Sequence, residues 1–313
     1  MKNIVFMTDN NCVMPTYIAI LSLYNSKLKS TQLKVYITTY NVTKENCELL
    51  KTLSRDDFEV ILVDISHLEL DDLSNENIKR YAPIILFRLQ LDSIFPNLSK
   101  ILLLDVDIIV KKDISTLFEV DLNGKYIAGV RDLYVTFEYM KNKNILYEHY
   151  VNSGVLLLNL DLIRKDNFFK KVSEYYLNNG KNFKYPEQDA INYLIGEKIK
   201  LLPPIYNYLV SYKRFSKKYI ANFYKLYSET LLDENNIAII HYAGYKPWVY
   251  KTFPLEEHWD KIYQISGFAN QPLDKINKYN ILVNLYINIR SIWHKVLYWK
   301  IFKKLISEST YTD

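Results

Sequence analysis

Two aspartates, Asp105 and Asp107, follow an apolar run that starts at Lys100 and continues Ile-Leu-Leu-Leu. Carboxylates one residue apart at a strand end point the same way if extended, or straddle a turn, and can share one hard divalent cation. A pyrophosphate leaving group needs such a cation. The alternative is that one aspartate caps a helix near Ile114 and the other is solvated, since Asp-x-Asp is a common sequence. The apolar run favours a ligand site, because open α/β sheets bind ligands at the carboxyl ends of their strands.

A histidine, His241, follows a second apolar run that starts after Asn236. An imidazole at a strand end is a common third metal ligand, although a single histidine is more often an ordinary core or surface residue. Gly244 and Lys246 come shortly after it. Beside a metal, a diphosphate requires a backbone that allows close approach and a cation. This segment therefore predicts a metal site with a neighbouring diphosphate.

Two further segments place polar residues abruptly against an apolar element. Residues 152–159 open with Asn152, and residues 186–192 contain Glu187 and Gln188. Each arrangement is explained either by capping of the element or by the lining of a pocket. The residue types alone leave both explanations open.

Short apolar runs alternate with segments in which apolar residues recur at spacings of three and four, as in residues 17–24. This alternation of strands and helices predicts a doubly wound, mostly parallel sheet. Pro15 fits the first turn of the first helix. Residues 100–110 are expected to form one buried central strand, with the two acids at or just beyond its end. The other expected elements are strands at residues 4–7, 33–37, 60–63, 127–130, 155–159 and 237–240 and a helix at residues 188–195.

The composition is that of a soluble globular protein with one main domain. Of its 313 residues, 49% are hydrophobic and 24% are charged, and its seven glycines form neither common Gly-rich phosphate motif. Cys12 and Cys47 are too few for a disulfide framework, so we expect reduced thiols. The apolar run at residues 4–7 is too short for a signal peptide, and no stretch is long enough to span a bilayer. We therefore expect a cytoplasmic protein.

The C-terminal segment is basic and aromatic. Residues 275–304 contain seven Lys and Arg residues and no acid, interleaved with Tyr, Trp and Phe. This composition suits a helix on an anionic membrane surface, here the inner face of the cytoplasmic membrane. The alternative is a helix packed on the core with a solvated basic face. Since the net charge of +5 comes largely from this segment, we expect no nucleic-acid partner.

The four polar clusters, in this order and spacing, resemble the retaining glycosyltransferase family 8, which includes bacterial lipopolysaccharide galactosyl- and glucosyltransferases and glycogenin. The resemblance covers about residues 3–250, including the Val-Phe-Met-Thr-Asp-Asn-Asn run from Val5 and the Phe-Arg-Leu-Gln-Leu run around Arg88. It implies an α/β fold of the GT-A type, Rossmann-like and typical of nucleotide-diphospho-sugar transferases, with a mixed, mostly parallel sheet flanked by helices. We expect the catalytic domain at residues 1–255 and a helical, basic C-terminal segment at residues 256–313.

The resemblance also implies roles for individual residues. The implied ligands of Mn²⁺, with Mg²⁺ as the alternative ion, are Asp105, Asp107 and His241. The residues implied around the uridine and diphosphate of a UDP-sugar are Thr8, Asp9, Asn11, Arg88, Asp105, Val106, Gly244 and Lys246. Those implied around the donor sugar are Asp132, Asn152, Glu187 and Gln188, with Gln188 nearest to the reactive face of the anomeric carbon. In the family's usual pattern two residues lie between this glycine and this lysine. Here a single residue, Tyr245, separates Gly244 from Lys246.

The implied activity is transfer of a hexose from UDP-galactose or UDP-glucose to a glycan acceptor, such as lipopolysaccharide or lipooligosaccharide, with retention at the anomeric carbon. Because the amide oxygen of Gln188 is uncharged and a poor nucleophile, we expect same-face substitution without a covalent intermediate. The alternatives are a self-glycosylating or protein-glycosylating transferase, for which 28 tyrosines offer acceptors, and a non-catalytic nucleotide-sugar-binding protein. A nucleotidyltransferase is disfavoured, because residues 8–12 supply no Gly-rich or basic loop.

Overall fold

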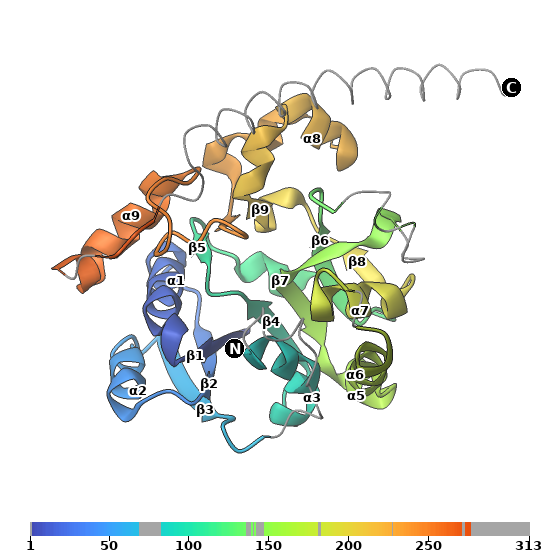
Figure 1. Ribbon diagram of the computed structural model, residues 1–313, viewed down its shortest axis with the longest axis horizontal. Helices are drawn as coiled ribbons and strands as arrows, with labels where there is room; N and C mark the ends of the chain where they lie inside the picture. The colour runs from blue at the N-terminus through green and yellow to red at the C-terminus, as the bar shows by residue number, and fades with distance from the viewer. Residues whose placement is uncertain are drawn as a thin grey trace, which may run out of the picture.

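The computed structural model describes residues 2–68, 83–135, 139, 141, 147–180, 183–226, 228–270 and 273–276. In this part of the chain, seven strands form the main sheet in the order β3-β2-β1-β4-β7-β6-β8 (Figure 1). All neighbours are parallel except that β7 runs antiparallel to β4 and β6. The expected mixed, mostly parallel sheet is confirmed. Its strands are β1 (Lys2–Asp9), β2 (Leu33–Tyr40), β3 (Phe58–Asp64), β4 (Lys100–Leu104), β6 (Ile127–Arg131), β7 (Val151–Asn159) and β8 (Ile199–Leu201).

Helices cover both faces of the main sheet, so its central strands are buried on both sides (Figure 1). Ile4 and Phe6 of β1 belong to one core, whereas Val5 between them belongs to the core on the opposite face. A strand buried in this way must be apolar at every position, which explains the continuous apolar runs in the sequence. The first face carries α1 (Val13–Ser26) and α2 (Lys44–Lys51), and the second carries α3 (Leu91–Ile94), α5 (Leu160–Lys165), α6 (Phe168–Asn179) and α7 (Pro186–Ile195).

A second, smaller sheet has the order β5-β10-β9. Its strands are β5 (Ile108–Val110), β9 (Tyr208–Leu209) and β10 (Ile239–His241). The expectation of a single strand over residues 100–110 is therefore wrong, because the chain leaves the main sheet after Leu104 and enters the small sheet at Ile108. The physical reason is that two carboxylates lie between these points, and a strand buried on both faces cannot hold unpaired charges. The turn removes them from the core.

The other expected strands and the expected helix are present, with some ends shifted. β7 begins at Val151, four residues before the expected start, because its polar first residues continue the pairing with β6. β10 begins at Ile239 and extends to His241. α7 starts at Pro186, as the preference of proline for the first helical turn favours. Pro15 lies in the first turn of α1, as predicted.

Short helices complete the described chain. The α-helices among them are α8 (Lys217–Phe223) and α9 (Glu256–Ile265). The 3-10 helices are η1 (Asn10–Cys12), η3 (Pro83–Gln90), η4 (Ser115–Glu119), η5 (Tyr147–His149), η7 (Pro204–Tyr206), η8 (Val210–Arg214), η9 (Glu229–Leu232), η10 (Glu234–Asn236) and η11 (Phe268–Asn270).

The helix α9 opens the predicted C-terminal segment and packs beside α1 (Figure 1). Its Trp259 is 1% exposed and belongs to the same core cluster as Ile18 of α1. This packing ties the start of the segment to the sheet. The boundary between residues 255 and 256 stays a prediction.

Most of the basic tail predicted to bind membranes, residues 275–304, lies outside the described residues. Its described start folds back on the protein, where Ile276 forms a parallel bridge with Tyr250. The ammonium group of Lys275 lies 5.2 Å from the centre of the Trp259 ring. Within the described ranges, no helix combines the length and the apolar character needed to cross a membrane.

Candidate functional site

A cavity of about 600 Å³ opens where β1, β4, β6 and β10 end. The first residues of β7 reach the same edge, because this strand runs in the opposite direction. The cavity has the size of a small-molecule site. The predicted site residues that line it are Asp9, Arg88, Asp105, Val106, Asp107, Asp132, Asn152, Glu187, Gln188, His241, Gly244 and Lys246.

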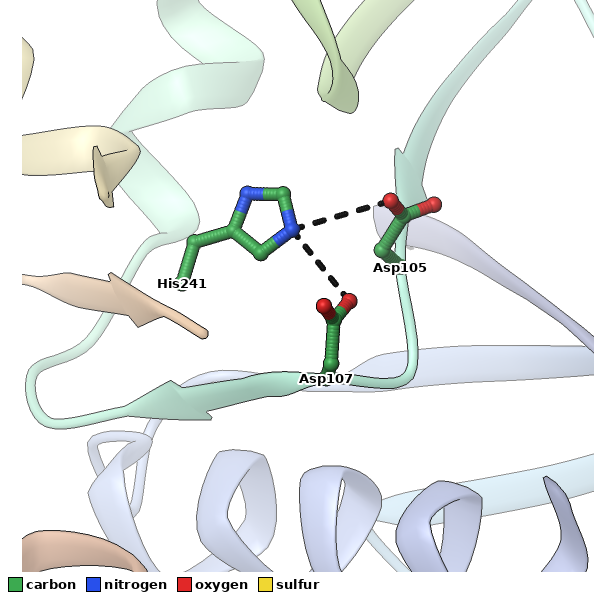
Figure 2. Close-up of side chains that lie close together, drawn as sticks. All are labelled: Asp105, Asp107 and His241. Carbon is green, nitrogen blue, oxygen red and sulfur yellow. Dashed lines mark ion pairs between the residues drawn. The ribbon is translucent and has the colours of Figure 1, made fainter. Parts of the chain in front are cut away.

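Asp105, Asp107 and His241 converge on one point of the cavity, the aspartates from the turn after β4 and the histidine from the end of β10 (Figure 2). Nε2 of His241 lies 3.2 Å from Oδ1 of Asp107 and 3.7 Å from Oδ2 of Asp105. One ligand atom from each residue lies within 4.8 Å of the other two, as a shared ion requires. Two carboxylates and an imidazole suit a divalent transition metal such as Mn²⁺.

The charges of Asp107, His241 and Lys246 shift one another's pKa. Burial opposes ionisation of Asp107, but Lys246 and His241 beside it hold its pKa below the ordinary value. Burial also opposes protonation of His241, but Asp107 and Asp105 raise its pKa above the ordinary value. The Asp107 carboxylate is therefore ionised at neutral pH, ready to accept a cation.

The backbone of β7 leaves room for two of the candidate ligands at this point. The amide of Asp105 donates to the carbonyl of Gly154 over 2.8 Å, which holds the turn against β7. A Cβ atom on Gly154 would contact Cε1 of His241 and would lie 2.7 Å from Oδ2 of Asp105. Only glycine fits here without displacing two of the three candidate ligands. The donor set and the close approach of the ligands that Gly154 allows together fit a bound metal.

Asn207 orients the histidine. Nδ1 of His241 lies 2.8 Å from Oδ1 of Asn207, and since this oxygen can only accept, Nδ1 carries the proton. Nε2 then faces the two aspartates, and in the neutral imidazole it is the nitrogen available to bind a metal. The amide nitrogen of Asn207 donates to Oδ1 of Asn152 over 2.9 Å. Asn207 is fully buried and connects the metal cluster to the predicted sugar-binding residues.

Arg88 is buried beneath the cavity and joins two of the predicted regions. Its guanidinium lies 2.8 Å from Oδ1 of Asp105 and 3.1 Å from Oε1 of Glu187, and it donates to the carbonyl of Ser153. Burial raises the pKa of Glu187 above its ordinary value even though Arg88 acts in the opposite direction. Arg88 thus holds Asp105 and Glu187 in fixed positions.

Lys246 reaches the metal cluster despite the shortened spacing after Gly244. Its Nζ lies 2.5 Å from Oδ2 of Asp107, across 139 positions of sequence. The Lys246 side chain is 42% exposed, whereas that of Asp107 is 3% exposed. The ammonium group therefore lies between the buried carboxylate and the open cavity, where a diphosphate bound beside the metal would meet it.

A polar network forms the wall on the side of β6 and α7. Nδ2 of Asn152 donates to Oδ2 of Asp132 over 3.1 Å and to Oε1 of Gln188 over 3.3 Å. The amide of Gln188 is held at both ends, because Oε1 accepts from the backbone of Ser153 and Nε2 donates to the hydroxyl of Tyr150. Burial raises the pKa of Asp132 above its ordinary value. These groups can hydrogen-bond the hydroxyls of a bound sugar and fix its orientation.

Two of the predicted donor-site residues do not line the cavity. Thr8 is fully buried, and its hydroxyl accepts from Thr16 and donates to the carbonyl of Asp9. Asn11 lies in η1, and its backbone amide donates to Oδ1 of Asp9, which caps this helix. Of residues 5–12, Met7, Asp9 and Cys12 line the cavity. Any contact of Thr8 or Asn11 with a nucleoside stays a prediction.

Several residues that line or support the cavity were not predicted from the sequence. Ser153 and Gly154 directly follow Asn152 in the sequence, and this position is the signal that could have identified them. Asn207 and Arg214 follow no strand whose end could be recognised in the sequence, and β9 has only two residues. The unpredicted residues that line the cavity include Tyr134, Ser153, Tyr185, Leu209, Ser211, Arg214 and Tyr245.

Comparison with known proteins identifies the family. The sequence matches the family described as glycosyl transferase family 8 over residues 3–252. A lipopolysaccharide 1,2-glucosyltransferase of Escherichia coli is 27% identical over 289 residues, which cover 88% of this chain and 82% of that protein. Glycosyltransferase GlyB of Streptococcus pneumoniae serotype 4 is 30% identical over 261 residues, which cover 79% of this chain and 57% of GlyB. The chain thus spans little more than half of the latter relative.

Solved structures show the same fold. The galactosyltransferase LgtC, in complex with donor and acceptor sugar analogs, superposes with a TM-score of 0.67 at 21% identity. The superposition covers 88% of this chain and 98% of LgtC. It confirms the predicted GT-A fold.

Proposed function

The chain belongs to glycosyltransferase family 8, and from this membership we propose that it transfers galactose or glucose from a UDP-sugar to a glycan acceptor with retention at the anomeric carbon. The observation that carries the proposal is the meeting of Asp105, Asp107 and His241 in one cavity with the polar network of Asp132 and Gln188. The first group suits a metal–diphosphate and the second suits a sugar. Their juxtaposition is what a sugar-nucleotide donor requires.

Asp105, Asp107 and His241 are the proposed metal ligands. A divalent ion bound there, Mn²⁺ or Mg²⁺, would supply positive charge against the negative charge that develops on the leaving diphosphate. Lys246 adds a second positive charge from the open side of the cluster, at hydrogen-bonding distance from Asp107. Gly244 beside it allows a phosphate to approach the backbone.

The network on the wall near β6 is proposed to hold the donor sugar. Asn152 and Asp132 are already oriented by their mutual hydrogen bond, so little side-chain entropy is lost when a sugar hydroxyl binds. Asn207 links this wall to His241 through Asn152, so the sugar and the diphosphate are positioned by one continuous set of contacts. Such fixed positioning lowers the entropic barrier of the transfer.

Retention is proposed to proceed by same-face substitution. Gln188 is held through both of its amide atoms by Ser153 and Tyr150, so it acts as a fixed dipole beside the reacting centre. An uncharged amide held in this way is a poor nucleophile for a covalent intermediate. The acceptor hydroxyl would then attack from the side on which the diphosphate departs.

The proposed acceptor is a cell-surface glycan, because relatives of this chain include lipopolysaccharide glucosyltransferases. Such an acceptor would be met at the inner face of the cytoplasmic membrane, and the basic segment at residues 275–304 is proposed to contact that surface. A comparison of UDP-glucose with UDP-galactose as donors identifies the sugar.

The test is UDP release from UDP-glucose and from UDP-galactose, each with Mn²⁺ and with EDTA. We expect UDP release from one of the two donors in the presence of Mn²⁺ and not in the presence of EDTA. We expect Asp107→Ala to lower the rate of this release by about a hundredfold or more. The control is Asp161→Ala, whose carboxylate is 62% exposed on α5 and pairs with Arg164. Absence of UDP release, together with absence of metal-dependent UDP binding in the folded protein, would contradict the proposal.

A further inference from the structure

Three Lys and Arg side chains line the cavity within the described ranges, and they differ in their partners. Arg88 is paired with Asp105 and Glu187, and Lys246 is paired with Asp107. Arg214 is the third, and no carboxylate of the described residues forms an ion pair with it. A half-buried guanidinium without an anionic partner is a ready binding group for an anion.

The contacts of Arg214 leave most of its donors available. Its guanidinium donates to the hydroxyl of Tyr245 and lies over that ring, with Cζ 5.5 Å from the ring centre. A guanidinium has five N–H donors, and this contact uses one of them. Tyr245 therefore fixes the orientation of Arg214 without neutralising its charge.

The helix η8, which carries Arg214, lies against the end of β6. Tyr212, two residues earlier in η8, donates to the carbonyl of Arg131 at the end of β6. Arg214 thus lies near the wall proposed to hold the sugar.

Arg214 is also adjacent to the proposed diphosphate contact, because its partner Tyr245 precedes Lys246 in the chain. This step rests on the proposed function: in same-face substitution the acceptor hydroxyl approaches on the side from which the diphosphate leaves. A residue that borders both the sugar wall and the diphosphate lies where the acceptor must enter.

We propose that Arg214 is the anion-binding group of the acceptor subsite, and that the acceptor carries a phosphate or a carboxylate close to the hydroxyl that receives the sugar. Both anions present two oxygens that match the fork of a guanidinium, so two parallel hydrogen bonds can form. A lysine would provide the charge but not this geometry. Arg214 would then select anionic glycans over neutral ones.

The test measures binding of three matched sugars to the complex of the protein with UDP and Mn²⁺: glucose, glucuronate and glucose 6-phosphate. UDP occupies the diphosphate site, so a preference for the anionic sugars cannot come from that site. We expect one or both anionic sugars to bind about tenfold or more tightly than glucose, and the tighter of the two identifies the carboxylate or the phosphate. Arg214→Gln should remove this preference, and Arg214→Lys should keep part of it.

The matched control is Lys213→Gln, since Lys213 is exposed and its Nζ lies 3.6 Å from Glu234, outside the cavity lining. Equal affinities for all three sugars in the wild type would overturn the proposal. It would also be overturned if Arg214→Gln weakened UDP binding and donor hydrolysis, because Arg214 would then serve the donor diphosphate. If the wild type neither bound UDP nor released it from a UDP-sugar, the proposed function would be refuted, and the acceptor assignment with it.

Discussion

The side-chain oxygen of Asn207 lies 2.8 Å from Nδ1 of His241 and thereby decides which imidazole nitrogen faces the two aspartates. We expect Asn207→Ala to lower Mn²⁺ affinity by about 10- to 100-fold, because loss of a partner that orients a metal-bound histidine has effects of this size. Asn207→Asp should retain most of the affinity, since a carboxylate also accepts from Nδ1. Titration followed by electron paramagnetic resonance measures free Mn²⁺ directly. The control is Asn178→Ala on the surface of α6, and equal affinity of Asn207→Ala and wild type would contradict the role.

Alanine substitutions of Gly154 and Gly129 test whether the absence of a side chain at Gly154 serves metal binding. Gly154→Ala places a methyl group against His241 and Asp105, so we expect a large loss of Mn²⁺ affinity and of UDP release. Gly129→Ala instead places the methyl 3.0 Å from Leu156 in the core, which should cost about 1–3 kcal/mol of folding stability without changing Mn²⁺ affinity. Metal titration and urea unfolding of both variants separate the two effects. The reverse pattern would show that Gly154 serves packing alone.

Lys246 is expected to serve the diphosphate rather than the metal. Lys246→Ala should weaken UDP binding in the presence of Mn²⁺ by about 10- to 100-fold, as expected for a lost charge-assisted hydrogen bond. Mn²⁺ affinity in the absence of UDP should not fall, because the substitution removes a cation beside Asp107. Calorimetric titration measures both affinities, with Lys251→Ala as the exposed control. A fall in Mn²⁺ affinity alone would assign Lys246 to the metal cluster.

Asp113, which does not line the cavity, makes a pH-dependent contribution to the free energy of unfolding. Its carboxylate accepts from the amides of Leu28 and Ser115 and from the hydroxyl of Thr31. Burial opposes its charge, but these donors lower its pKa below the ordinary value of 3.8. A lowered pKa means that the stabilisation is present at neutral pH and is lost as the pH falls through the folded-state pKa.

We therefore expect Asp113→Asn to cost about 1–3 kcal/mol in urea unfolding at pH 7. The difference from wild type should shrink as the pH falls below about 4. Asp121→Asn is the control, since Asp121 is exposed and accepts one hydrogen bond, from Asn123. A difference that stays constant from pH 7 to pH 3 would show that the ionised form of Asp113 is not the source.

Trp259 tests whether α9 belongs to the catalytic unit. Its ring is buried and stacks on Tyr263 with ring centres 4.8 Å apart. We expect Trp259→Ala to cost about 3–5 kcal/mol in urea unfolding, as for other buried large-to-small changes. Ile265→Ala in the same helix should change stability by less than about 0.5 kcal/mol, because Ile265 is 61% exposed. A stability change below that level for Trp259→Ala would support a boundary at residue 255.

The elements of this protein were largely predictable from the sequence. β1 and the helix that follows it carry strong apolar signals, because β1 is buried on both faces of the sheet and α1 packs into two core clusters. The interruption after Leu104 was missed, because a turn of three residues leaves no change in an otherwise apolar run. Hydrophobicity reports burial, and both strands on either side of the turn are buried.

The candidate ligands could also be named in advance, whereas their support could not. Asp107 and His241 each follow an apolar run, and the rule that ligands gather at strand ends brings them to one edge. Asn207 and Arg214 follow no such signal, since their positions depend on the two-residue strand β9 and on packing against β6 and β10. Thr8 illustrates the opposite case, because its hydroxyl is taken up by Thr16 once α1 is packed.

The alternation of strands and helices, the candidate metal ligands and the family can be read from the sequence, because periodicity and local motifs are properties of neighbouring residues. The folded chain is needed to show that Gly154 leaves room for His241 and Asp105, that Arg88 bridges Asp105 and Glu187, and that Lys246 meets Asp107. These contacts join residues far apart in the chain, up to 139 positions, and they form when helices, loops and strands pack together.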